Sequence, residues 1–172
     1  MCGIIGIVGK SPVQDRLVES LLRLEYRGYD SAGIAGATAP GIVERRRAQG
    51  KIKALQDVLA DQPLAAHVGI GHTRWATHGA PSERNAHPHT AGRVTLVHNG
   101  IIENFAELRR ELEAEGRTFE SDTDTEVIAQ LLDSHLSRGL APLPALKATL
   151  DRLTGAFALA VLIAGEEDML LG

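Results

Sequence analysis

The chain has 172 residues, a length that suits one domain with a sizeable buried core. Its formal net charge of -4 leaves no basic footprint, so we expect no nucleic acid partner. No stretch approaches the roughly 20 apolar residues of a membrane span, and no signal-like segment opens the chain. With one cysteine it has no intramolecular disulfide framework, and we expect a cytoplasmic protein without membrane contact.

The first half of the chain predicts short strands separated by amphipathic helices. Residues 3–8 are an apolar run bounded by glycines, which indicates a buried strand. Ser11 and Pro12 then predict the N-cap and first turn of a helix that ends by Gly28. The remaining elements expected in this half are strands at 33–37, 42–47 and 67–74 and a short helix lined by Ile52, Leu55 and Leu59 that ends at Pro63.

The second half predicts a strand over 94–98, three helices and a final strand. Asn104 with Glu107 three residues later is typical of a capping box, and residues 122–126 are rich in N-capping side chains. The later elements are a helix lined by Leu143, Leu146, Leu150 and Leu153, a strand over 156–163 and the beginning of a partner strand at 169–172. Because strands and helices occur in clusters, we predict an α+β fold of stacked layers and not a doubly wound parallel sheet.

Cys2 stands one residue from the start of the chain, directly before the first predicted strand. If Met1 is removed, this residue carries both a thiol and a free α-amino group. Peptide α-amines titrate near neutral pH, so the amine can take the thiol proton directly or through one water. A lone cysteine is otherwise a small buried hydrophobe. On this residue alone, both interpretations stay open.

Three later segments carry groups that suit acyl transfer. Arg74 follows a predicted strand, and its planar guanidinium matches a carboxylate. Asn99 and Gly100 offer a side-chain amide donor beside an unobstructed backbone N–H, as an oxyanion hole requires, although Asn-Gly also suits a hairpin turn. Asp122 and Asp124 stand just before a predicted helix, which they cap by default, although one of them facing a pocket can instead hold an ammonium group.

Histidines cluster between residues 72 and 98, at positions 72, 78, 87, 89 and 98. Their spacing matches no zinc signature, so we expect no metal and assign most of them to hydrogen bonds within loops. A Cys/His/Asn protease site made of Cys2, His98 and Asn99 is a further alternative. It leaves the terminal position of Cys2 without a reason and ranks below the terminal nucleophile.

Five motifs in order along the chain resemble the N-terminal glutaminase domain of the glucosamine-6-phosphate synthase family, the isomerizing glutamine:fructose-6-phosphate aminotransferases. They are Cys-Gly-Ile at 2–4, Leu-Glu-Tyr-Arg-Gly-Tyr-Asp-Ser-Ala-Gly at 24–33, His-Thr-Arg-Trp-Ala-Thr-His-Gly at 72–79, His-Asn-Gly-Ile-Ile-Glu-Asn at 98–104 and Asp-Thr-Asp-Thr-Glu at 122–126. The likeness runs from the first residue to the last. The wider class is the N-terminal-nucleophile glutamine amidotransferases, so the resemblance implies a four-layer αββα sandwich.

The resemblance also implies a role for each matching position. Cys2 becomes the nucleophile with its α-amine as base, and Asn99 and the Gly100 N–H become the oxyanion hole. The implied substrate-binding residues are Arg74 for the glutamine α-carboxylate, Asp124 for its α-ammonium, and Thr77 and His78 in a loop that closes over the substrate. Trp75 is similar to the tryptophan that gates ammonia passage in this family.

The implied activity is hydrolysis of L-glutamine to glutamate and ammonia through a thioester, with no cofactor or metal. In the full-length enzyme the ammonia converts fructose 6-phosphate to glucosamine 6-phosphate in sugar-isomerase domains, and the enzyme is a homodimer. Because family members continue beyond this length, we expect residues 1–172 to be a truncated glutaminase domain without those sugar-isomerase domains. A non-catalytic fragment that keeps the motifs, or the glutaminase domain of another class II amidotransferase, remains an alternative.

Overall fold

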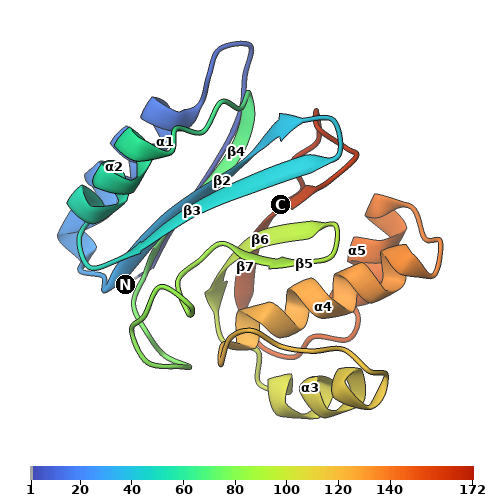
Figure 1. The fold of residues 1–172 in the computed structure, drawn as a ribbon. Coiled ribbons are helices and arrows are strands. Elements are labelled where there is room, and N and C mark those ends of the chain that lie inside the picture. The colour runs from blue at the N-terminus through green and yellow to red at the C-terminus, as the bar shows by residue number, and fades with distance from the viewer. Residues whose placement is uncertain (1) are drawn as a thin grey trace.

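Two antiparallel sheets lie face to face at the centre of the computed structural model, which describes residues 2–172 (Figure 1). The first sheet has the strand order β1-β4-β2-β3, with bounds Gly3–Val8, Val68–Arg74, Ser31–Ala39 and Ile42–Gln49. The second has the order β5-β6-β7, with bounds His89–Ala91, Val94–Gly100 and Phe157–Ile163. Leu171 adds an isolated antiparallel bridge to Val161 of β7.

Helices cover the outer face of each sheet (Figure 1). The first sheet is covered by α1 (Gln14–Leu24), which continues into the 3₁₀ turn η1 (Glu25–Arg27), and by α2 (Ile52–Asp61). The second is covered by α3 (Phe105–Ala114), α4 (Asp124–Ser137) and α5 (Pro142–Leu150), with α4 directly against β5 and β6. The predicted α+β fold with αββα layering is therefore confirmed.

The space between the two sheets is filled by apolar side chains over most of its length. Its core consists of Ala35, Val68, Ile70, Val97, Ala160 and Leu162, drawn from both sheets. Side chains alternate along a strand, so His72 and Arg74, two and four residues beyond Ile70, face this same gap. By the same alternation Asn99 shares a face with Val97 of β6. The apolar gap thus ends in polar side chains contributed by both sheets.

The predicted N-cap at Ser11 is wrong. Helix α1 begins at Gln14 with Val13 at the N-cap position and no side-chain cap. The reason is a tertiary contact, because the Gly9 N–H donates to the His67 carbonyl and the Val13 N–H to the Ala66 carbonyl. These bonds hold residues 9–13 against the segment that leads into β4. Because the N–H groups of Gly9 and Val13 are used there, the helix begins only after Val13.

The predicted capping box at Asn104 is also wrong, although α3 begins at the expected place. The Asn104 side chain makes no cap bond. Its amide instead donates to the Arg152 carbonyl at 2.9 Å and its oxygen accepts from the Thr154 N–H at 3.0 Å. Asn104 therefore ties the start of α3 to the segment that leads into β7. In addition, α5 ends at Leu150, before the expected Leu153, and the short strand β5 is not among the predicted strands.

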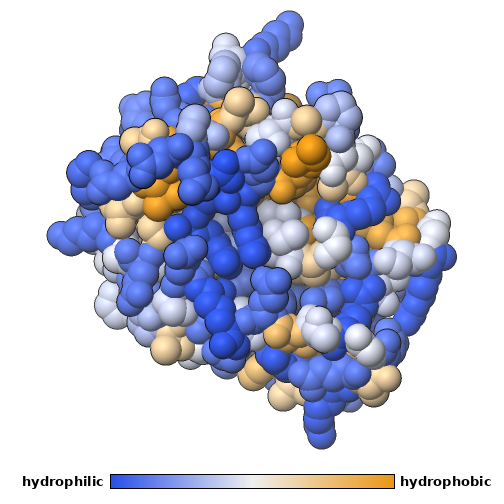
Figure 2. Space-filling view, in the orientation of Figure 1, coloured by the Kyte–Doolittle hydropathy of each residue, from blue (hydrophilic) through white to orange (hydrophobic). Residues whose placement is uncertain are grey.

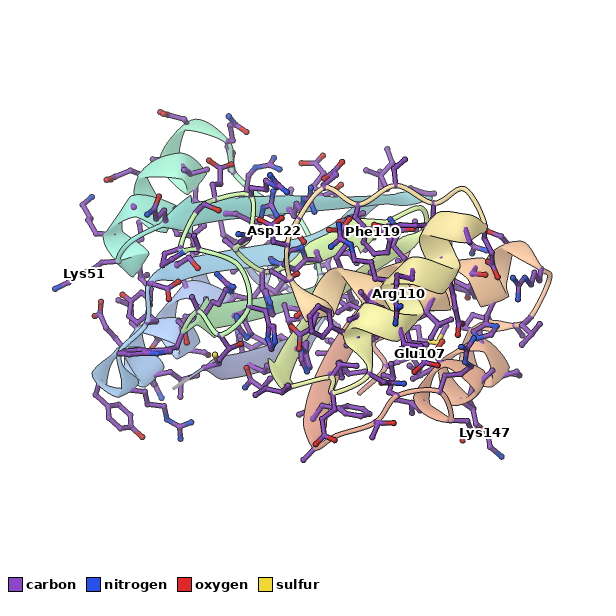
Figure 3. The ribbon with its side chains drawn as sticks, turned by 90° about the horizontal axis from the view of Figure 1, so that it is seen from below. Lys51, Glu107, Arg110, Phe119, Asp122 and Lys147 are labelled. Atoms are coloured by element: carbon purple, nitrogen blue, oxygen red, sulfur yellow. The ribbon has the colours of Figure 1, made fainter. Side chains whose placement is uncertain are left out.

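One face of the surface is covered mainly by polar side chains (Figure 2). The face shown in Figure 2 is mainly hydrophilic, and its hydrophobic residues lie in small separate patches. Lys51 and Lys147, at opposite ends of the view in Figure 3, both point away from the protein. Within residues 2–172, every helix is too short or too polar to cross a lipid bilayer.

Gly33 gives a test of how closely the long loop between β4 and β5 packs on the first sheet. A Cβ at Gly33 would lie 2.2 Å from the His87 carbonyl oxygen. We expect Gly33→Ala to lower the free energy of unfolding by about 1–3 kcal/mol, measured by urea denaturation, because backbone must move. Gly9→Ala is the matched control, because the nearest atom to its Cβ is 3.6 Å away. Equal losses in the two variants would contradict the close approach.

Candidate active site

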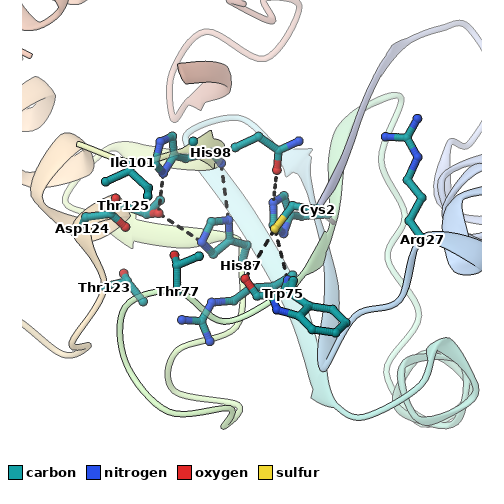
Figure 4. Close-up of a pocket in the computed structure, with 14 residues that line it drawn as sticks. Cys2, Arg27, Trp75, Thr77, His87, His98, Ile101, Thr123, Asp124 and Thr125 are labelled. Atoms are coloured by element: carbon teal, nitrogen blue, oxygen red, sulfur yellow. Dashed lines mark hydrogen bonds between the residues drawn. The ribbon is translucent and has the colours of Figure 1, made fainter. Parts of the chain in front are cut away.

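A pocket of about 450 Å³ opens at the polar end of the gap between the sheets. All of the site residues predicted from the sequence line it except His78. Figure 4 shows Cys2 and Trp75 on one side of the pocket, with Asp124, Thr123 and Thr125 on the other. The pocket therefore joins the first sheet to the N-terminus of α4.

The Cys2 thiol lies at the pocket and is not a buried hydrophobe. Gly3 pairs with Thr73, so the pairing of β1 with β4 brings Cys2 beside the residues that follow β4. The Trp75 backbone N–H donates to Cys2 Sγ at 3.1 Å, and Sγ lies 3.6 Å from the Trp75 carbonyl oxygen. A donated N–H stabilises a thiolate. The proposed α-amine base depends on removal of Met1, which lies outside the described residues.

Asn99 and Gly100 do not form a hairpin turn, because they are the last residues of β6 and pair with Ala158 and Phe157 of β7. Gly100 has φ 124°, and a Cβ there would lie 2.3 Å from the Ala156 carbonyl oxygen. Only glycine fits this position. Asn99 is half-buried, and its Oδ1 lies 2.8 Å from His72 Nε2.

Arg74 is a buried cation with part of its guanidinium unused. Its side chain is only 4% exposed, and Nη2 donates to the carbonyls of His78 and Gly79. Nη1 has no hydrogen-bond partner, and no carboxylate of residues 2–172 lies within ion-pair distance. Burial lowers the pKa of Arg74, since desolvation disfavours the charged form. A buried guanidinium with an unpartnered N–H group has the geometry that suits an anion.

Asp124 supplies the opposite charge at the first residue of α4. It does not cap the helix, because Thr123 is the N-cap and accepts from the Glu126 N–H. Asp124 is 4% exposed, and its Oδ2 accepts from the Ile102 N–H at 3.0 Å. Within the described chain its Oδ1 makes no hydrogen bond. Asp124 therefore places a carboxylate oxygen without a hydrogen-bond partner in the lining of the pocket.

The loop after β4 is held in place by Asp30. The Ala76 N–H donates to Asp30 Oδ2 at 2.5 Å, and the Asp30 N–H donates to the Arg74 carbonyl at 2.7 Å. The Trp75 side chain is 55% exposed and packs over Gly28, where a Cβ would lie 2.9 Å from its ring. The anchored backbone sets the position of the Trp75 N–H, while the indole ring stays at the surface.

Thr77 is exposed and lines the pocket. The His78 ring instead contacts Phe105, with ring centroids 4.8 Å apart. His78 therefore reaches the site through its carbonyl, which accepts from Arg74, and its side chain is absent from the pocket lining.

Four of the histidines are buried: His72, His87, His89 and His98. The assignment of most histidines to loop hydrogen bonds is wrong for His72, His89 and His98, which lie on strands, whereas His87 lies in a loop. Burial lowers the pKa of each, to about 3 for His72, so the rings are neutral at neutral pH. Their partners are other rings, threonine hydroxyls and, for His72, the Asn99 side chain. In residues 2–172, no group of three or more acidic, histidine or cysteine side chains is arranged to hold a metal.

Several pocket residues were not identified as site residues from the sequence, notably His87, Ile101 and Thr125. The Thr125 hydroxyl lies 2.9 Å from His98 Nδ1 and 3.1 Å from His87 Nε2. The position of Thr125 in the polar 122–126 motif could have identified it as a site residue from the sequence. His87 belongs to a loop without periodicity, so no sequence pattern pointed to it. Cys2 and His98 make no hydrogen bond to each other within the described chain, so the protease alternative gains no support.

Comparison with known proteins determines the family. A family model described as a glutamine amidotransferase domain matches residues 72–172. The chain belongs to the glutamine amidotransferase family. Over its full length it is 80% identical to the glutamine--fructose-6-phosphate aminotransferase [isomerizing] of Caulobacter vibrioides and 59% identical to that of Gluconobacter oxydans. It spans 28% of the length of each of these relatives.

Solved structures share the amidotransferase fold. The glutamine phosphoribosylpyrophosphate amidotransferase from B. subtilis, complexed with ADP and GMP, matches with a TM-score of 0.78 and 26% identity. This match covers 95% of the present chain and 35% of that one. A glutamine aminotransferase class-II domain protein from Silicibacter pomeroyi, 18% identical, matches with a TM-score of 0.62 over 96% of this chain and 73% of that one. The second likeness concerns the fold alone.

The buried histidines predict that stability falls on mild acidification. Their pKa values are lower in the folded protein than in the unfolded chain, so the unfolded state binds more protons below about pH 6.5. The contribution of these neutral rings to the free energy of unfolding is fully present above that pH. It is lost as pH falls, by up to about 1.4 kcal/mol per pH unit for each such histidine. We expect a lower Tm at about pH 5.5 than at about pH 7.5, measured by calorimetry, since few carboxylates titrate in that range.

The control for this pH dependence is His67→Asn, because His67 is exposed. This variant should keep the wild-type dependence of Tm on pH. A wild-type Tm that stays the same over this pH range would contradict the prediction, because protonation of the buried rings would then not lower the free energy of unfolding.

Proposed function

We propose that this chain is the glutaminase unit of an isomerizing glutamine:fructose-6-phosphate aminotransferase, and that residues 1–172 hydrolyse L-glutamine to glutamate and ammonia. One observation carries the proposal: a thiol, a buried guanidinium and a buried carboxylate line the same pocket as the Asn99-Gly100 donors. Arg74 and Asp124 match the α-carboxylate and α-ammonium of a free amino acid. The name shared by relatives up to 80% identical over the full chain supports the assignment to this reaction.

The proposed reaction begins with the free α-amine of Cys2, formed by removal of Met1. The amine takes the thiol proton, and the thiolate attacks the side-chain amide carbon of glutamine, forming a C–S bond. The oxyanion that develops is bound by the Asn99 amide and the Gly100 N–H, each worth about 2.7–4 kcal/mol in acyl transfer. The C–N bond then breaks, and ammonia leaves with the proton held by the amine. Water hydrolyses the thioester to glutamate and restores the thiol.

Further roles in this proposal concern substrate closure and the use of ammonia. Thr77 and His78 belong to the loop that closes over glutamine, and Trp75 gates ammonia passage toward a sugar site. Conversion of fructose 6-phosphate to glucosamine 6-phosphate, and assembly as a homodimer, belong to the whole protein in the cytoplasm. Trp75 lines the pocket with an exposed side chain, and its backbone N–H contacts the Cys2 thiol, which supports the gating role. No step requires a metal or a cofactor.

The alternatives are a non-catalytic fragment and the glutaminase domain of another class II amidotransferase. The pocket argues against the first, because its complementary groups are assembled within residues 2–172. Sequence identity argues against the second alternative. The chain is 80% identical to an isomerizing aminotransferase but only 26% identical to the phosphoribosylpyrophosphate amidotransferase. Measuring ammonia release from glutamine by the purified chain, with its fold checked by circular dichroism, separates an enzyme from a remnant.

The terminal-nucleophile mechanism predicts opposite effects for tags at the two ends. An uncleaved extension ahead of Cys2 converts its α-amine into a non-basic amide, so glutaminase activity should be abolished. The same tag placed after Gly172 should leave activity in place, which makes it the matched control. Full activity with an uncleaved N-terminal tag, verified by intact mass, would exclude the α-amine as the base.

The oxyanion role predicts a kinetic defect for Asn99→Ala. A donor that acts mainly in the transition state affects kcat more than binding, so kcat for glutamine hydrolysis should fall by about 10²–10³-fold with a small change in KM. Steady-state assays of glutamate production over a range of glutamine concentrations provide both constants. A raised KM with unchanged kcat would instead indicate a residue that serves only substrate binding.

A further inference from the structure

We propose that His72 is a positioning residue for the oxyanion hole: it holds the Asn99 amide in the one orientation that turns the NH₂ group, and not the oxygen, toward the reacting carbonyl. This inference rests on the proposed glutaminase function. It concerns a residue that contributes no reacting atom itself and acts through Asn99.

The contact between the two side chains determines which atom is the donor. His72 Nε2 lies 2.8 Å from Asn99 Oδ1, and His72 Nδ1 is buried without a partner in the described chain. His72 is completely buried, which lowers its pKa to about 3. A neutral imidazole has one N–H, and an amide oxygen only accepts, so the proton is on Nε2. His72 therefore donates to Asn99.

This donated bond decides what Asn99 presents to the pocket. The two terminal atoms of an amide point in different directions, so binding the oxygen to His72 turns the NH₂ group away from that ring. Asn99 lines the pocket and is half-buried, and its NH₂ group makes no hydrogen bond to any residue from 2 to 172. Rotation of the amide by half a turn would place the oxygen lone pairs where the substrate oxyanion forms, which is repulsive.

His72 is itself held rigidly. It lies on β4, where it pairs with Ile4 of β1 on one side and Gly33 of β2 on the other. Its ring stacks on His87, with centroids 4.1 Å apart. His87 in turn lies between the His98 N–H, 3.4 Å from its Nδ1, and a threonine hydroxyl, 3.1 Å from its Nε2. Asn99 is thus anchored to a stack of neutral rings between the two sheets.

The test compares His72→Phe with wild type in the intact protein. Phenylalanine keeps a ring for stacking on His87 and removes the N–H. We expect kcat for glutamine hydrolysis to fall by at least about 10-fold but by no more than in Asn99→Ala, with KM changed by less than about 3-fold. His72→Gln should recover part of the loss, because its amide can donate to Asn99 Oδ1.

A double variant separates positioning from a general structural effect. If His72 acts through Asn99, then His72→Phe together with Asn99→Ala should have the same kcat as Asn99→Ala alone. Multiplied losses would overturn the proposal. His89→Phe is the matched control: it is another buried histidine of the cluster, it lies outside the pocket lining, and it should change kcat by less than about 3-fold even if Tm falls.

A measurement on the wild-type protein keeps the proposal testable if His72→Phe does not fold. Nitrogen-15 NMR of the imidazoles at neutral pH should show His72 as the neutral Nε2–H tautomer. The Nδ1–H tautomer, an imidazolium or an unchanged kcat in His72→Phe would overturn the positioning role. Wild-type protein that releases no ammonia from glutamine would instead refute the proposed function, a result distinct from all of these.

Discussion

The antiparallel pairing of β1 with β4 is the constraint on which the site depends. Because Gly3 pairs with Thr73, the residue before β1 lies beside the residues that end β4. That register places the Cys2 thiol 3.1 Å from the Trp75 N–H and in the same pocket as Arg74. A shift of this register by one residue would turn every side chain of β1 to the other face of the sheet and move the thiol away from the pocket.

The second sheet completes the pocket because the two sheets face each other. The apolar part of their interface holds β4 and β6 together, and beyond it Asn99 of β6 meets His72 of β4. Burying histidines here disfavours their charged forms, and the resulting neutral rings pack against one another. The same burial leaves Arg74 with an unpartnered Nη1. A buried guanidinium nitrogen without a hydrogen-bond partner is available to an anionic group.

Most of the layered fold was predictable from local patterns, and the errors have physical causes. Apolar runs and helical spacing predicted the principal strands and helices because each element buries one face. The caps at Ser11 and Asn104 were predicted wrongly because distant backbone groups, near Ala66 and Arg152, compete for the same polar atoms. The short strand β5 has no pattern of its own and exists by pairing with β6.

The sequence by itself determined the amidotransferase family and the residue types of the pocket, because ordered motifs are properties of the chain, and the resemblance to that family implied the αββα layering. Tertiary structure alone decided that Asn99-Gly100 ends a strand and that His78 contributes a carbonyl. It also decided that His72 reaches Asn99 across 27 residues of sequence. Such contacts depend on strand register and sheet packing, which join residues that no local pattern connects.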